Sequence, residues 1–165
     1  MRKMMLALLT LLLVVGLVPA AAADSRLAAA RAATARYHDI GAALADGYVS
    51  TVECVALPGG EAMGVHFIKP ALLDTTLDVR QPEVLLYEPR ANGKGFRLVG
   101  VEYLQVDSDQ DLSTSDGTIF LGQPLVGPMP GHGPGMPIHQ ELHVWVWRHN
   151  PAGMFAQFNA AVRCP

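Results

Sequence analysis

The chain has 165 residues, of which 12 are Lys or Arg and 15 are Asp or Glu, and half are hydrophobic. That length is enough for one domain with a substantial apolar core. The net charge of −3 offers no electrostatic attraction for phosphates, so nucleic acid is excluded as a partner.

The first 23 residues have the pattern of an export signal. Arg2 and Lys3 precede the apolar run MLALLTLLLVVGLV, and three alanines stand at 21–23. The run is short for a membrane span and no stop-transfer charges follow it, so we expect cleavage before Asp24 and a secreted protein, extracellular or periplasmic. The remaining 142 of the 165 residues, 24–165, would form one secreted domain with ten basic and fifteen acidic side chains, and this balance excludes attraction to anionic membranes.

Residues 25–46 predict one helix. They are rich in alanine and begin at an Asp-Ser capping pair, and Gly47 follows as a stop signal. Gly41 is the expected place for any bend. Four residues share one face at helical spacing and predict the side that packs on the core: Tyr37, Ile40, Leu44 and Tyr48.

The rest of the chain predicts β-structure. Alternating and β-branched runs end at turn residues, and Asn92-Gly93 indicates a hairpin. We expect strands over 50–57, 62–68, 83–88, 96–106, 118–127 and from 139 onward. The fold class is therefore predicted as α+β, a single domain with the N-terminal helix packed on a curved antiparallel sheet or half-open β-barrel.

Two cysteines, Cys54 and Cys164, stand near the start of the predicted sheet and at the C-terminus. In an exported chain the simplest interpretation is one disulfide. In the chain-entropy description, closing a loop of roughly 100 residues contributes about 4–5 kcal/mol. The alternative, a pair of copper-binding thiols, lacks the close spacing that such a motif needs.

Three of the predicted strands carry polar side chains in rows that are otherwise apolar. The even positions from Phe96 to Val106 form an apolar row that includes Glu102, and His66 shares a face with Gly64 and Ile68. A buried carboxylate is costly unless it is paired or bound to a metal, so imidazoles gathered around it would offset that cost. The last strand places six ionisable or aromatic residues on one face: His139, Glu141, His143, Trp145, Trp147 and His149.

These rows predict a divalent transition-metal site with four ligands, namely His66, Glu102, His143 and, as the fourth, His139. Imidazole and carboxylate suit zinc, iron, manganese or copper, and the set does not choose among them. Residues four apart on a strand lie about 13 Å apart, so His139 and His143 share an ion only if the strand bends, as Pro137 would permit. Otherwise Glu141 pairs with one of the two histidines.

The sequence leaves open whether the protein is an enzyme. If it is, we expect a metal-activated water or a metal-oxygen species in a pocket walled by Tyr103, Trp145 and Trp147. Glu102 would be a ligand or a general base, with Glu141 as the reserve candidate for the catalytic role. Neither the reaction nor the oligomeric state is indicated.

Two other function classes fit the same residues. One is a non-enzymatic binding module whose aromatic-lined cavity holds a small apolar or sugar-like molecule, with the histidines acting only as hydrogen-bonding groups. The other is a structural secreted domain without a site, in which each buried polar group has its own partner.

Three weaker patterns favour ordinary roles. HQELH at 139–143 resembles a zinc-protease motif, but Gln140 stands where that motif has glutamate. DSDQD at 107–111 lacks the glycine and the distal glutamate of a calcium loop, so we expect a solvated acidic turn. His132, in PGHGPG, is expected on a surface turn, although it could cap the site from that loop.

Five segments span most of the mature chain: ALADGYV, AMGVHF, PEVLLYEP, LVGVEY and PGMPIHQELHVWVWRHNPAGMFA. In these segments the chain resembles a group of secreted bacterial proteins of unknown function, most specifically in HVWVWRHNPAGMF at 143–155. The resemblance implies no activity. It implies that the family pattern includes six polar positions, which favours a shared site: His66, Glu102, His132, His139, His143 and His149.

Overall fold

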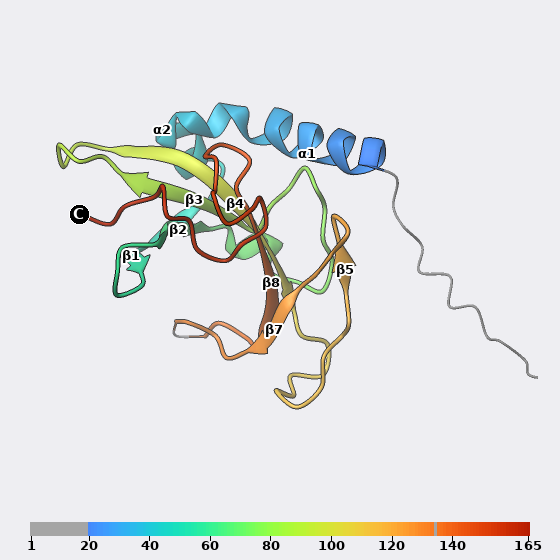
Figure 1. Ribbon diagram of the computed structural model, residues 1–165. Helices are drawn as coiled ribbons and strands as arrows, with labels where there is room; N and C mark the ends of the chain where they lie inside the picture. The colour runs from blue at the N-terminus through green and yellow to red at the C-terminus, as the bar shows by residue number, and fades with distance from the viewer. Residues whose placement is uncertain (1–19, 134) are drawn as a thin grey trace, which may run out of the picture.

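Helices lie across one face of an antiparallel sheet, as Figure 1 shows for the computed structural model, which describes residues 20–133 and 135–165. This arrangement is the α+β class that the sequence predicts, and the sheet is open. The predicted export signal falls largely on residues 1–19, which lie outside the described residues. Among the described helices, none is long and apolar enough to cross a bilayer.

The helical segment is broken in two. α1 (Ala20–Thr34) and α2 (Ile40–Ala45) are joined by a short 3-10 turn over Ala35–His38. Asp39 has an extended backbone conformation, and its carboxylate accepts a hydrogen bond from the backbone N–H of Gly41 at 2.9 Å. This cap begins a new helix, so the helix predicted over 25–46 is interrupted at Asp39, close to Gly41, where a bend was expected.

Aromatic side chains hold the helical layer on the sheet. Tyr37 and Tyr48 are buried, as predicted from helical spacing, whereas Leu44 is 52% exposed and does not face the core. The hydroxyl of Tyr87, on the sheet, donates to the backbone oxygen of Tyr37 at 2.6 Å. The indole N–H of Trp147 donates to the hydroxyl of Thr34 at 3.1 Å.

The main sheet has six strands in the order β1-β2-β3-β4-β8-β7, with every neighbouring pair antiparallel. β5 (Ile119–Phe120) and β6 (Gln123–Pro124) form a separate hairpin, so the continuous strand predicted over 118–127 is wrong. The positive φ of Leu121 and Gly122 turns the chain there. The six main strands are β1 (Val49–Ala56), β2 (Ala62–Ile68), β3 (Val84–Pro89), β4 (Phe96–Val106), β7 (Val126–Met129) and β8 (His139–Val144).

Both faces of the sheet are packed. The first hydrophobic core lies under the helices and takes alternate strand residues such as Val65, Leu85 and Leu142. The second lies on the opposite face and includes Val84 and Trp145, with the C-terminal segment packed against it. Buried polar groups on the second face therefore lie on the side of the sheet away from the helices.

A β-bulge in β4 changes which residues face the helices. Leu86 pairs with Gly100 and Tyr87 with Leu98, which leaves Val99 as an extra residue on β4. Leu98, before the bulge, packs in the helix-side core, while Leu104, after it, packs on the opposite face. The predicted even-numbered row from Phe96 to Val106 is therefore wrong at its N-terminal end.

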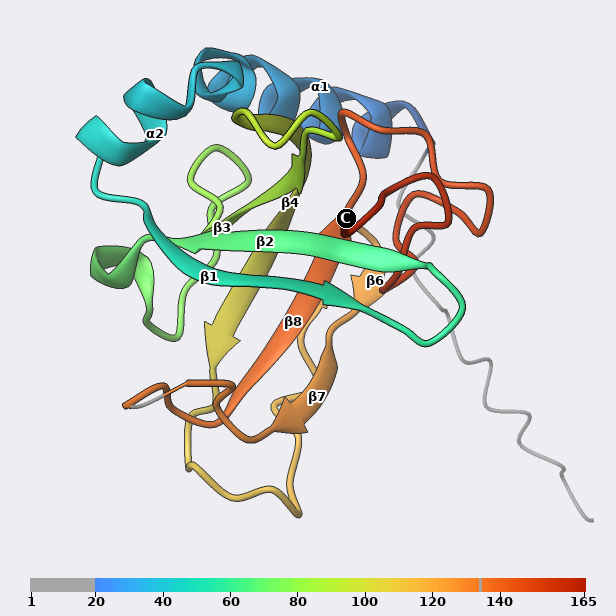
Figure 2. The same cartoon turned by 90° about the vertical axis from the view of Figure 1, so that its left-hand side faces the viewer.

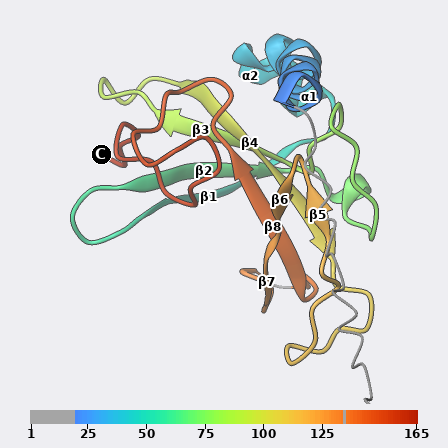
Figure 3. The ribbon, with the colours of Figure 1, turned by 45° about the vertical axis from the view of Figure 1, so that its right-hand side comes forward.

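The sheet is strongly twisted and curved. Figures 2 and 3 show β1 and β2 running across β4 and β8 at a steep angle. In a flat sheet, β2 and β8 would be three strand spacings apart, roughly 14 Å. The rings of His66 on β2 and His143 on β8 nevertheless lie 5.9 Å apart, so the curvature brings their side chains together.

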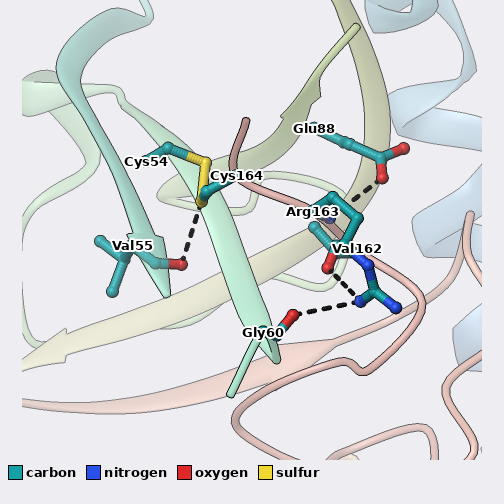
Figure 4. Close-up of a disulfide and its surroundings, with 7 residues drawn as sticks. All are labelled: Cys54, Val55, Gly60, Glu88, Val162, Arg163 and Cys164. Carbon is teal, nitrogen blue, oxygen red and sulfur yellow. Dashed lines mark hydrogen bonds between the residues drawn. A yellow bond between two sulfur atoms is a disulfide. The ribbon is translucent and has the colours of Figure 1, made fainter. Parts of the chain in front are cut away.

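The disulfide between Cys54 and Cys164 confirms the predicted pairing and ties the C-terminus to β1 (Figure 4). Two further contacts hold the same segment. The backbone N–H of Arg163 donates to a carboxylate oxygen of Glu88 at 3.1 Å, and its guanidinium donates to the backbone oxygen of Gly60 at 3.1 Å. A disulfide is typical of proteins in oxidising compartments, which agrees with the predicted export.

Candidate metal centre

Three side chains from β2, β4 and β8 meet on the sheet face away from the helices. The Nε2 atoms of His66 and His143 lie 3.3 Å and 3.6 Å from the same oxygen of Glu102, Oε2. Glu102 pairs directly with His143 across β4 and β8, and His66 reaches them because of the sheet's curvature. The three form a cluster that could hold a metal ion.

The atoms at the centre of this cluster are sheltered and unsatisfied. The side chains of Glu102 and His143 are 3% and 2% exposed, and that of His66 is 15% exposed. Within the described residues, neither Glu102 Oε2 nor His143 Nε2 has a hydrogen-bond partner. Buried polar atoms normally have a hydrogen-bond partner, so the lack of one here indicates that these atoms bind a group other than a described side chain.

A second group adjoins the first through Glu141. Its carboxylate lies between two histidines of the same strand, with Oε2 3.6 Å from His139 Nε2 and Oε1 3.6 Å from His143 Nδ1. The ligand atoms of Glu141, His139 and His132 lie within 4.8 Å of one another. The four predicted ligands therefore fall in two groups: His139 lies with His132 and Glu141, and the other three lie together.

Burial and neighbouring charges shift the pKa values of the two carboxyls of the cluster in opposite directions. Burial, together with the charge of Glu141, raises the pKa of Glu102 to about 8. Burial also opposes ionisation of Glu141, but the neighbouring imidazoles of His139 and His143 outweigh it and lower that pKa. Burial lowers the pKa of His66 to about 4 and lowers that of His143, so both imidazoles are neutral near pH 7 and have a free nitrogen lone pair.

A cavity of about 810 Å³ opens on the cluster, and four of the polar side chains line it: His66, Glu102, His132 and Glu141. Most of the other lining side chains are aliphatic or thioether groups, such as Ile68, Val84 and Met136. A small molecule could therefore reach the cluster through an apolar space.

The aromatic residues that were expected to wall the pocket lie outside this cavity. No described Phe, Tyr or Trp lines this cavity, so the predicted aromatic-lined pocket is wrong. Tyr103 packs in the helix-side core, next to Glu102 in sequence but on the opposite face. β8 ends at Val144, so its alternation does not extend to Trp147, which packs against the helix-side core. Trp145 stacks behind His143 with ring centroids 6.1 Å apart.

Two residues of the site are not marked by any local sequence pattern. His132, expected on a surface turn, is indeed exposed, but its ring lies 5.0 Å from that of His139. In the sequence, only the predicted resemblance to a protein group places His132 in a shared site. Gln157 donates to Oε1 of Glu141 at 3.2 Å from the C-terminal segment. His149, also part of that pattern, is exposed, and its side chain is not in either group.

Another buried carboxyl, Glu83, predicts how stability changes with pH. It is 2% exposed and accepts a hydrogen bond from the backbone N–H of Leu104. Burial, with smaller effects from the charges of Asp74 and Glu102, raises its pKa from 4.5 to about 8. The folded protein then keeps a proton that the unfolded chain releases, so this group's contribution to stability falls as pH rises from about 4.5 to about 8.

Glu83→Gln is expected to flatten that pH dependence, because the amide is neutral throughout. Urea unfolding at pH 5 and pH 8.5 should show the variant gaining stability over the wild type at the higher pH, on the order of 2 kcal/mol. Glu61→Gln, at an exposed position, is the control and should leave the slope unchanged. Equal slopes in the wild type and Glu83→Gln would contradict the prediction.

Comparison with models of known protein families, with curated proteins and with solved structures finds no match. The resemblance to a group of secreted bacterial proteins therefore stays a prediction, and the function has to be inferred from the site.

Proposed function

We propose that this protein is an exported metal-binding protein that holds one divalent transition-metal ion between His66, Glu102 and His143. The observation that carries the proposal is the spacing of three inward-facing ligand atoms. Ligands about 2.0–2.2 Å from a tetrahedral ion lie about 3.3–3.6 Å from one another. The two imidazole nitrogens lie 3.3 Å and 3.6 Å from Glu102 Oε2, which is this spacing.

The surroundings support an ion rather than a set of hydrogen bonds. Two central atoms, Glu102 Oε2 and His143 Nε2, are buried without a hydrogen-bond partner among the described residues. An ion would satisfy both and offset the cost of burying a carboxylate. Two imidazoles and one carboxylate form a set that suits zinc, iron, manganese or copper.

The cavity supports a role in which a small molecule reaches the ion. His66 and Glu102 line it, so one side of the proposed coordination sphere faces open space. Three protein ligands with an open position are typical of catalytic zinc sites, whereas structural zinc sites are closed by four protein ligands. Glu141 also lines the cavity, which supports its reserve role as a general base in a site that holds the first ion alone.

The test is metal analysis of protein purified without a histidine tag, stripped with a chelator and reloaded separately with zinc, manganese, iron(II) or copper(II). We expect tight binding of at least one of these metals by the wild type, and the loss of one ion per chain in His66→Ala combined with His143→Ala. His149→Ala is the control, because that histidine is exposed and lies in neither group. Substoichiometric metal that the double variant leaves unchanged would reject the proposal and favour a binding module that uses the cavity without metal.

A further inference from the structure

The group next to the proposed site has the features of a second metal site. Glu141 and His139 lie on the same face of β8, two residues apart. His132 comes from the loop between β7 and β8, which the pairing of Met129 with His139 holds beside the strand. One ligand atom from each of these three residues lies within 4.8 Å of the other two.

The orientation of His139 points to a cation. Its Nδ1 lies 3.0 Å from the backbone oxygen of Pro137. A carbonyl oxygen only accepts, so Nδ1 carries the hydrogen and the neutral ring has its lone pair on Nε2. A backbone carbonyl that accepts from the second nitrogen is also the usual support of a metal-bound histidine.

That lone pair faces a carboxylate. His139 Nε2 is buried, has no hydrogen bond to a described residue, and lies 3.6 Å from Oε2 of Glu141. Two electron-rich atoms facing each other away from water repel, unless a positive charge lies between them. The alternatives for that charge are a metal ion or a proton that makes His139 an imidazolium.

The position of His132 favours the metal ion. A protonated His139 paired with Glu141 would need no third group, yet a nitrogen of the His132 imidazole also lies within 4.8 Å of the ligand atoms of both. That side chain lines the cavity, so the open side of this group faces the same space as the first site.

The two groups share a boundary formed by Glu141 and His143. Glu141 directs one oxygen at His139 and the other at Nδ1 of His143, while Nε2 of His143 faces Glu102. Gln157 holds the carboxylate in this position by donating to Oε1. An ion in each group would therefore lie on either side of the pair formed by Glu141 and His143.

We infer that the protein binds a second divalent transition-metal ion through His132, His139 and Glu141, forming a two-metal centre with the first. The inference rests on the proposed function for its first ion, and the second ion has its own ligands. The two sites are thus separable by mutation.

Zinc titration of the stripped full chain, with metal analysis after gel filtration, should give two ions per chain. His132→Ala should lower this to one, or weaken the second ion by at least tenfold, without loss of folding, because His132 is exposed on a loop. His149→Ala, another exposed histidine, should retain two ions. Loading with copper(II) supplies an independent readout. Two neighbouring ions should couple magnetically in the wild type, and His132→Ala should give the spectrum of an isolated ion.

One ion per chain that His132→Ala leaves unchanged but His66→Ala removes would overturn the inference and leave the proposed function standing. A proton on His139 would then be the charge between it and Glu141. One ion that His132→Ala removes but His66→Ala leaves would support this second site and reject the first. No bound metal in the wild type would overturn both.

Discussion

Replacing Glu102 with leucine is expected to abolish binding at the first metal site while leaving the metal-free protein at least as stable as the wild type. The Glu102 side chain is 3% exposed, and its Oε2 has no hydrogen bond to a described residue, so the carboxyl opposes folding when no ion is bound. Burial lowers the pKa of both His66 and His143, so removing the carboxyl leaves neutral imidazoles and no unpaired buried charge, and the cost to the metal-free fold should be small. Loss of one of three ligands should weaken zinc binding by more than about 100-fold, since even a supporting residue outside the coordination sphere is worth about 10–100-fold.

The matched control is Glu53→Leu, which removes an exposed carboxylate that lines the same cavity. It should change zinc affinity by no more than about twofold, because Glu53 is outside both ligand groups. Competition with a chromogenic chelator measures the affinity, and urea unfolding of the zinc-free proteins measures the stability. A Glu102→Leu protein that is strongly destabilised and still binds zinc would show that Glu102 serves as a structural ion-pair partner of the histidines.

Gly64→Ala is expected to cause a large loss of stability, although it adds only one methyl group, and to disturb the metal centre as well. Gly64 lies in β2 with φ +92°, a conformation that L side chains rarely adopt. A Cβ at this position would lie 2.5 Å from the backbone oxygen of Tyr87 on β3. Backbone strain and the forced separation of two central strands should together cost about 3–5 kcal/mol.

The control is Gly93→Ala, at a turn with φ +67° and no atom within 4 Å of the added methyl group. It carries the conformational penalty without the clash and should cost about 1–2 kcal/mol. Urea unfolding compares the two, and zinc affinity follows the effect on His66, two residues beyond Gly64. Equal losses in both variants would mean that the close approach of β2 and β3 does not limit this position.

The two variants test different levels of the same structure. Glu102→Leu changes a group whose burial does not stabilise the metal-free fold, so zinc affinity should fall while stability stays the same or rises. Gly64→Ala changes the approach of two strands that position a ligand, so binding and stability should fall together. The contrast distinguishes a residue that binds the ion from one that shapes the sheet.

The sequence by itself determined the chemistry available on each strand. Side chains alternate along a strand, so local periodicity was enough to place His139, Glu141 and His143 on one face and to mark Glu102 as an unusual polar group. It also determined the disulfide between Cys54 and Cys164, since an exported chain with two cysteines has one simple pairing. These properties depend on residue type and short-range order.

Only the tertiary structure decided which of these groups meet. The curvature of the sheet, which brings His66 to His143 across two intervening strands, depends on contacts between residues far apart in the chain. The bulge at Val99 likewise changed which residues of β4 face the helices, and the end of β8 at Val144 interrupted the alternation that placed Trp147 beside the site. His132 reaches His139 by the course of a loop, which has no periodicity to predict from. Spacing along a chain specifies the face of a strand, but distances between strands follow from how the whole sheet packs.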